Sequence, residues 1–114
     1  MTDQFALTDD QQALLEHADR YGRERLAPLA PRMDAEEWWP DNLFPELGQL
    51  GLLGITIPER YGGVGLGLVE AGLVAQAFGR WNHALALSWV AHDNLCANNL
   101  HNNGSEAMRE KYLP

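Results

Sequence analysis

The segment from Leu68 to Arg80 constrains the fold more than any other part of this 114-residue chain. Apolar residues occupy nearly every side of a helix here, namely Leu68, Val69, Ala71, Leu73, Val74, Ala75, Ala77 and Phe78. A helix with so little polar surface is stable in water only when other elements surround it. We therefore expect a buried helix over 68–80, with the rest of the chain packed around it.

A first helix is expected near the N-terminus. Thr8 and Gln11 have the spacing of a capping box, in which each side chain bonds the backbone N–H of the other residue. Apolar residues then recur at helical spacing. Pro28 and Pro31 lack the N–H that a helix interior needs, so the sequence predicts that this helix stops there.

Three further helices are expected downstream. They cover a short segment from about residue 42 to Gly51 or Gly54, a longer one over 84–100, and one that follows a Ser105 cap and has barely begun at Pro114. Residues 55–58 alternate as a strand would, but nothing is available to pair with them, so they are expected to form an extended loop. The fold class is therefore all-α, a single helical bundle over 1–114.

The charge balance excludes some partners. The formal net charge is −8, so the acidic surface would repel a phosphate backbone and nucleic acid is not expected as a partner. Apolar runs are interrupted well before the roughly 20 residues that a membrane span needs. Cys96 is the only cysteine, which rules out an intrachain disulfide and favours a cytoplasmic location.

The glycines at 62, 63, 65 and 67 have two possible interpretations. They could form a loop that binds phosphate, but their spacing matches neither the dinucleotide fingerprint nor a Walker loop. A tight turn that lets the following helix pack closely is the favoured interpretation.

His92, Cys96 and His101 lie close together in sequence. A zinc site would need a fourth ligand and clearer pairing of the ligands, so the spacing favours a packed thiol and a hydrogen-bonded imidazole. No combination of nucleophile and base can be identified in the sequence, so we assign no catalytic residue in this chain.

Leu87, Ala91 and Leu95 are four residues apart and form a straight apolar ridge, with the small Ser88 beside it. Small residues on such a ridge leave room for something to lie against it. From the residues alone, another helix is favoured as the occupant.

Three stretches of the sequence resemble the opening of acyl-CoA dehydrogenases. They are Thr8-Asp-Asp-Gln11, the run LGLLGITIPERYGG from Leu50 to Gly63, and the segment from Ala91 to Pro114 that ends in YLP. The run LSWVAHDNLC is most similar to the branched-chain members, the isovaleryl-CoA dehydrogenases in particular. Trp89 and Val90 depart from that pattern, which has Tyr and a smaller residue at these positions.

This resemblance implies a flavoprotein that removes a proton and a hydride from adjacent carbons of an acyl-CoA and passes electrons from FAD to electron-transferring flavoprotein. It also implies a homotetramer whose subunits have a helical N-terminal, a middle β- and a C-terminal helical domain, of which this chain matches the first. The ridge would then line the far end of the acyl pocket with Leu87, Ser88, Ala91 and Leu95. The catalytic glutamate and the segments that hold FAD would lie outside this chain.

Two alternatives from other classes stay open on the sequence. One is a free-standing helical module that works by protein interaction. The other is a small carrier that binds an acyl ligand along the ridge.

Overall fold

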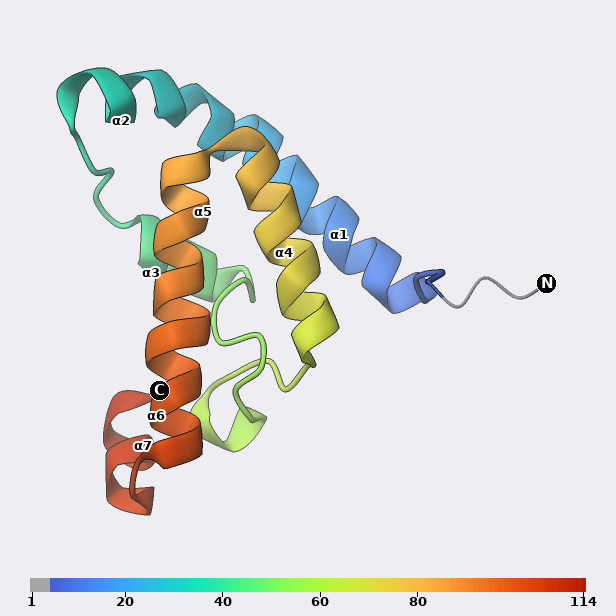
Figure 1. The fold of residues 1–114 in the computed structure, drawn as a ribbon, viewed down its shortest axis with the longest axis vertical. Coiled ribbons are helices and arrows are strands. Elements are labelled where there is room, and N and C mark those ends of the chain that lie inside the picture. The colour runs from blue at the N-terminus through green and yellow to red at the C-terminus, as the bar shows by residue number, and fades with distance from the viewer. Residues whose placement is uncertain (1–4) are drawn as a thin grey trace.

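The computed structural model describes residues 5–114, and all regular elements in this part of the chain are helical (Figure 1). In chain order, the α-helices are α1 (Asp9–Tyr21), α2 (Ala30–Glu36), α3 (Leu43–Gln49), α4 (Leu68–Trp81), α5 (His83–Val90), α6 (Asn98–Asn103) and α7 (Glu106–Tyr112). Two π-helical segments, η1 (Gly22–Leu26) and η4 (Ala91–Ala97), and two 3-10 turns, η2 (Ala27–Leu29) and η3 (Glu59–Tyr61), complete the set. The all-α prediction is confirmed. No helix among the described residues has both the length and the apolar character needed to cross a membrane.

The predicted start of α1 is confirmed, and its predicted end is wrong. The Thr8 hydroxyl accepts from the Gln11 N–H at 3.1 Å, and the Thr8 N–H donates to the Gln11 side chain at 3.0 Å. Helical turns nevertheless continue past Tyr21 through η1 and η2 to the end of α2. Pro28 and Pro31 each lie in the first turn of a new helical segment, where no intrahelical N–H bond is lost. The prolines therefore divide the helix without ending it.

Helix α4 lies between α1 and α5 (Figure 1) and supplies much of the core. Val74 and Phe78 are fully buried, and Phe78 meets the ring of Trp89 edge-on at 5.7 Å. The first turn of α4 differs from the prediction of a buried helix, because Leu68 is 70% and Val69 60% exposed. The described elements cover only part of the apolar surface of α4.

The long helix predicted over 84–100 is confirmed as one continuous run of α5, η4 and α6. Asn82 caps it: its side-chain oxygen accepts from the Leu85 N–H, and its amide group donates to the Leu26 carbonyl at 3.1 Å. This buried cap fixes the start of the run against η1. The Ser105 cap of α7 is also confirmed by its hydrogen bond from the Met108 N–H.

The glycine loop is a tight turn, as predicted. A β-carbon at Gly63 would lie 2.1 Å from the carbonyl oxygen of Ile57, so only glycine fits there. The backbone N–H groups from Gly62 to Leu66 all donate to backbone carbonyls within 54–59, and the Gly67 N–H donates to Glu70. Ile55 and Thr56 form a turn, which corrects the expectation of an extended loop.

Candidate functional site

The ridge predicted from the sequence lies on the outer face of α5 and η4. Leu87 is 74% and Leu95 64% exposed, while Ser88 and Ala91 are half-buried. The opposite face of the same run carries the buried core residues Leu85, Trp89 and Asp93. The sequence favoured another helix packed against the ridge. No helix of residues 5–114 covers it, so such a helix is not found within this part of the chain.

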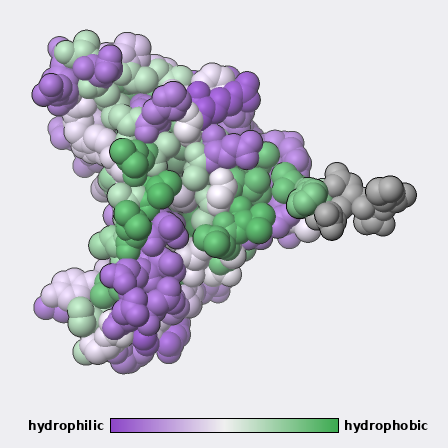
Figure 2. Space-filling view, viewed as in Figure 1, coloured by the Kyte–Doolittle hydropathy of each residue, from purple (hydrophilic) through white to green (hydrophobic). Residues whose placement is uncertain are grey.

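Hydrophobic residues gather on the face of the molecule that presents the ridge. Figure 2 shows one apolar cluster along α5 and η4 and a second over the first turn of α4. Leu68 and Val69 are the exposed large residues of that first turn. Exposed apolar surface of this kind is typical of a place where a ligand or another part of a protein binds.

A narrow cleft of about 180 Å³ separates the two clusters. Small residues of α4 line one side, and the long helix lines the other: the full set is Leu68, Ala71, Gly72, Ala75, Trp89, Val90 and Asn94. All of these side chains except Asn94 and the indole N–H of Trp89 are wholly apolar. The cleft therefore suits a short apolar group rather than a polar or charged one.

The structure brings some of the predicted site residues to this cleft and leaves others beside it. Val90 lines the cleft, and Ala91 follows it directly on the half-buried flank. Leu87 and Leu95 lie farther out on the exposed surface. The α4 wall was missed in the sequence, although the small residues Ala71, Gly72 and Ala75 recur there at a spacing that puts them on one side of a helix.

Gly72 offers a test of the α4 wall. A β-carbon at Gly72 would meet nothing within 4 Å, and the residue lies inside a helix. We expect Gly72→Ala to raise the free energy of unfolding by about 0.5–1 kcal/mol, because alanine loses less backbone entropy in a helix. Urea unfolding of the two proteins measures the difference. A destabilised variant would mean that the space beside Gly72 is filled by another part of the protein.

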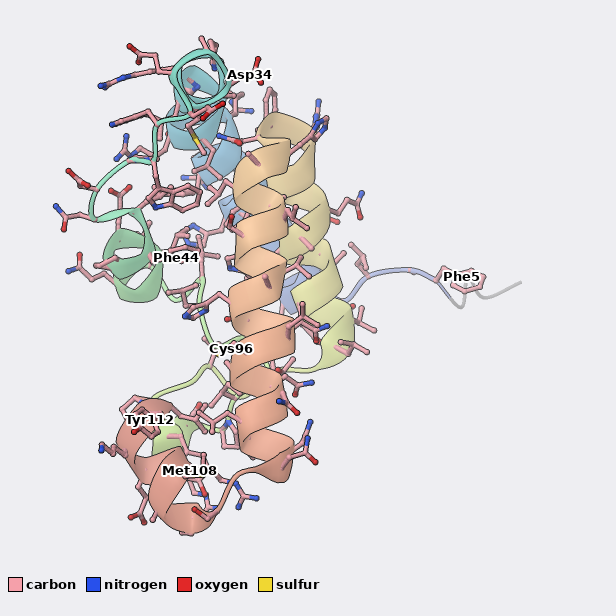
Figure 3. All side chains as sticks on the ribbon, turned by 60° about the vertical axis from the view of Figure 1, so that its left-hand side comes forward. Phe5, Asp34, Phe44, Cys96, Met108 and Tyr112 are labelled. Carbon is pink, nitrogen blue, oxygen red and sulfur yellow. The ribbon has the colours of Figure 1, made fainter. Side chains whose placement is uncertain are left out.

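The three residues considered for a metal site have separate surroundings. His92 stacks on Phe44 with 5.2 Å between ring centroids, and His101 meets Tyr61 edge-on at 5.9 Å. Cys96 is exposed and lies on the same side of the long helix as Phe44 and Tyr112 (Figure 3), so the prediction of a packed thiol is wrong. Residues rotate by a smaller angle in the π-helical register of η4 than in an α-helix, which turns Cys96 away from the buried face. Among the described residues, no group of three or more His, Cys, Asp and Glu could hold a metal ion.

The sequence matches the family model described as acyl-CoA dehydrogenase, N-terminal domain, over residues 8–114. The chain belongs to the acyl-CoA dehydrogenase family. It corresponds to the N-terminal domain of that family, and the helical architecture agrees with this assignment.

Relatives with acyl-CoA dehydrogenase names align along nearly the whole chain. Mitochondrial isovaleryl-CoA dehydrogenase of Pongo abelii is 43% identical over 110 residues, which are 95% of this chain and 26% of the relative. Mitochondrial 2-methylacyl-CoA dehydrogenase of Solanum tuberosum is 34% identical over 110 residues, 95% of this chain and 27% of the relative. This acyl-CoA dehydrogenase chain thus spans about a quarter of the length of the curated relatives it matches.

Two solved structures have the same fold. Butyryl-CoA dehydrogenase from Megasphaera elsdenii superposes with a TM-score of 0.88 at 32% identity, covering 97% of this chain and 30% of its own. A chain in a structure described as the electron transferring flavoprotein of Acidaminococcus fermentans superposes with a TM-score of 0.90 at 31% identity, covering 97% and 29%.

Proposed function

We propose that this chain is the N-terminal part of an FAD-dependent acyl-CoA dehydrogenase that oxidises a short or branched acyl-CoA, and that it supplies the wall around the acyl tail. The observation that carries the proposal is the apolar cleft between α4 and the long helix, flanked by the exposed ridge. The names of the relatives support the substrate class, since isovaleryl and 2-methylacyl groups are branched acyl groups.

The acyl tail would lie against Leu87, Ser88, Ala91 and Leu95 and reach into the cleft. The cleft volume of about 180 Å³ suits a group of a few carbon atoms. An apolar wall selects its ligand by steric exclusion, and one methylene that fits or does not fit changes transition-state binding by about 1–3 kcal/mol. The bulky Trp89 and Val90 both line the cleft, so they would limit the space left for the tail.

The described residues do not by themselves fit FAD. The N–H groups of the glycine loop are already bonded within the protein, and the cleft is apolar and too small for a dinucleotide. The flavin, which would accept the hydride, would therefore be held by segments other than this chain. We give no glutamate of this chain a catalytic role.

Three further expectations are independent of the cleft: the homotetramer and the electron acceptor follow from the family resemblance, and the cytoplasmic location follows from the single cysteine, Cys96. The complete protein would assemble as a homotetramer, pass its electrons to electron-transferring flavoprotein and act in the cytoplasm. The solved chain with the electron transferring flavoprotein description supports the second of these. All three stay predictions.

The visible absorption spectrum of the protein that carries this chain tests the proposed activity. We expect a flavin band that bleaches on anaerobic addition of isovaleryl-CoA, because oxidation of the acyl group reduces the flavin. A flavin band that keeps its intensity with short and branched acyl-CoA would contradict the proposed substrate class. A colourless protein that is stabilised against heating by the same ligand would instead support the carrier alternative.

A further inference from the structure

Asp93 is a buried carboxylate with an unusual set of partners. It is 2% exposed, and its two oxygens accept from consecutive backbone N–H groups, those of Gly54 at 2.5 Å and Ile55 at 3.1 Å. His92 Nδ1 lies 3.9 Å from the nearer oxygen. A buried charge is costly unless hydrogen bonds replace its water, and these backbone groups do so here. The left-handed backbone at Gly54 (φ 63°) turns both N–H groups toward the carboxylate.

Trp89 makes a second link one helical turn earlier. Its indole N–H donates to the Leu52 carbonyl at 2.7 Å, while its ring lines the apolar cleft. Two side chains of the long helix therefore hold the segment 52–55 by three hydrogen bonds. We call Trp89, Asp93 and this segment the clamp.

The clamp is also bonded to the segment that leads into α4. The Gly54 carbonyl accepts from the Val64 N–H at 2.9 Å, and the Ile55 carbonyl accepts from the Leu66 N–H at 2.8 Å. Leu66 comes two residues before the start of α4. Gly54 and Ile55 thus donate to Asp93 of the long helix through their N–H groups. Their carbonyls accept from the segment that precedes α4. One short path of hydrogen bonds therefore joins the long helix to the segment that leads into α4.

We propose that Asp93 is a positioning residue that sets the width of the acyl cleft and thereby the selectivity for the acyl tail. This inference rests on the proposed function, since the cleft has to hold the tail. Asp93 itself does not line the cleft. It acts on η4, the segment that carries Ala91 and Leu95, by fixing that segment relative to α4.

Asp93→Asn tests the clamp with almost no change in size. The amide oxygen can accept from one backbone N–H, but the amide NH2 then faces the other N–H and cannot accept from it. In the complete dehydrogenase, we expect the ratio of kcat/KM values for two acyl-CoA substrates that differ by two methylenes to fall by roughly tenfold. Steady-state kinetics with the two substrates measure this ratio.

Asp19→Asn is the matched control. Asp19 also joins two helices through its carboxylate, because it accepts from the Trp81 indole N–H at 2.8 Å on the α1 side of α4. The same substitution there removes the same charge away from the cleft. An amide oxygen can still accept from the Trp81 indole N–H, so we expect Asp19→Asn to lose only the exposed ion pair with Arg80 and to keep the wild-type selectivity ratio.

Trp89→Phe keeps the test decisive if Asp93→Asn does not fold. It leaves an aromatic ring in the cleft wall but removes both the donor to Leu52 and part of the ring volume that lines the cleft, so we expect the selectivity ratio to fall at least as far as in Asp93→Asn. A folded variant of either kind with the wild-type ratio would overturn the inference. Ala91→Phe, measured in parallel, distinguishes a failure of this inference from a failure of the proposed function. If Ala91→Phe changes the selectivity and the clamp variants do not, the role of Asp93 is refuted and the proposed function stands.

Discussion

Replacing Ala91 with Phe is expected to lower kcat/KM for acyl-CoA substrates with the longest accepted tails by about 100-fold, while the shortest accepted substrate loses much less. Ala91 is half-buried at the edge of the cleft and directly follows Val90 in the wall. A benzyl group at this position would occupy the space beside the cleft of about 180 Å³. Kinetics across a series of tail lengths measure the change.

Ala13→Phe provides the control for this substitution. Ala13 is exposed on α1, which packs on α4 away from the long helix (Figure 1). The same bulk added there should leave the profile across tail lengths unchanged. If Ala91→Phe also keeps the wild-type profile, the acyl tail does not lie against the ridge.

Gly63→Ala is expected to lower the free energy of unfolding by about 3 kcal/mol, which is at the upper end of the usual cost of overpacking. The added β-carbon would lie 2.1 Å from the Ile57 carbonyl oxygen and 2.5 Å from its carbon. These are backbone atoms, so no side-chain rotation relieves the contact. The hydrogen bond from the Gly65 N–H to the same carbonyl would also be disturbed.

The same substitution at Gly72 gives the comparison for Gly63→Ala. Both changes add one methyl group, but Gly72 has open space and Gly63 does not. Urea midpoints for the two variants should therefore move in opposite directions. Equal midpoints for Gly63→Ala and the unchanged protein would mean that the turn at 54–66 is looser than its hydrogen bonds indicate.

The sequence predicted the helices well because their signals are local. The Thr8 and Ser105 caps and the glycine turn depend on residues only a few positions apart, and each was found where expected. The prolines at 28 and 31 misled the prediction, because proline stops a helix only when its N–H would have been used. Whether a turn restarts after proline depends on packing that the sequence does not show.

Only one of the two walls of the candidate site was predicted from the sequence. The ridge at 87, 91 and 95 follows from helical spacing, but the α4 wall and the role of Asp93 depend on segments far apart in sequence. The bond between Asp93 and Gly54 joins residues 39 positions apart, and no local pattern indicates it. The exposure of Leu68 and Cys96 could not be predicted either, since it depends on which faces the other elements leave uncovered.

A crystal structure of the complete protein with isovaleryl-CoA tests the central claim most directly. We expect the branched end of the acyl group in van der Waals contact with Ala91 and with the cleft wall formed by Val90 and Gly72. An acyl tail bound elsewhere, with the cleft filled by protein side chains, would contradict it.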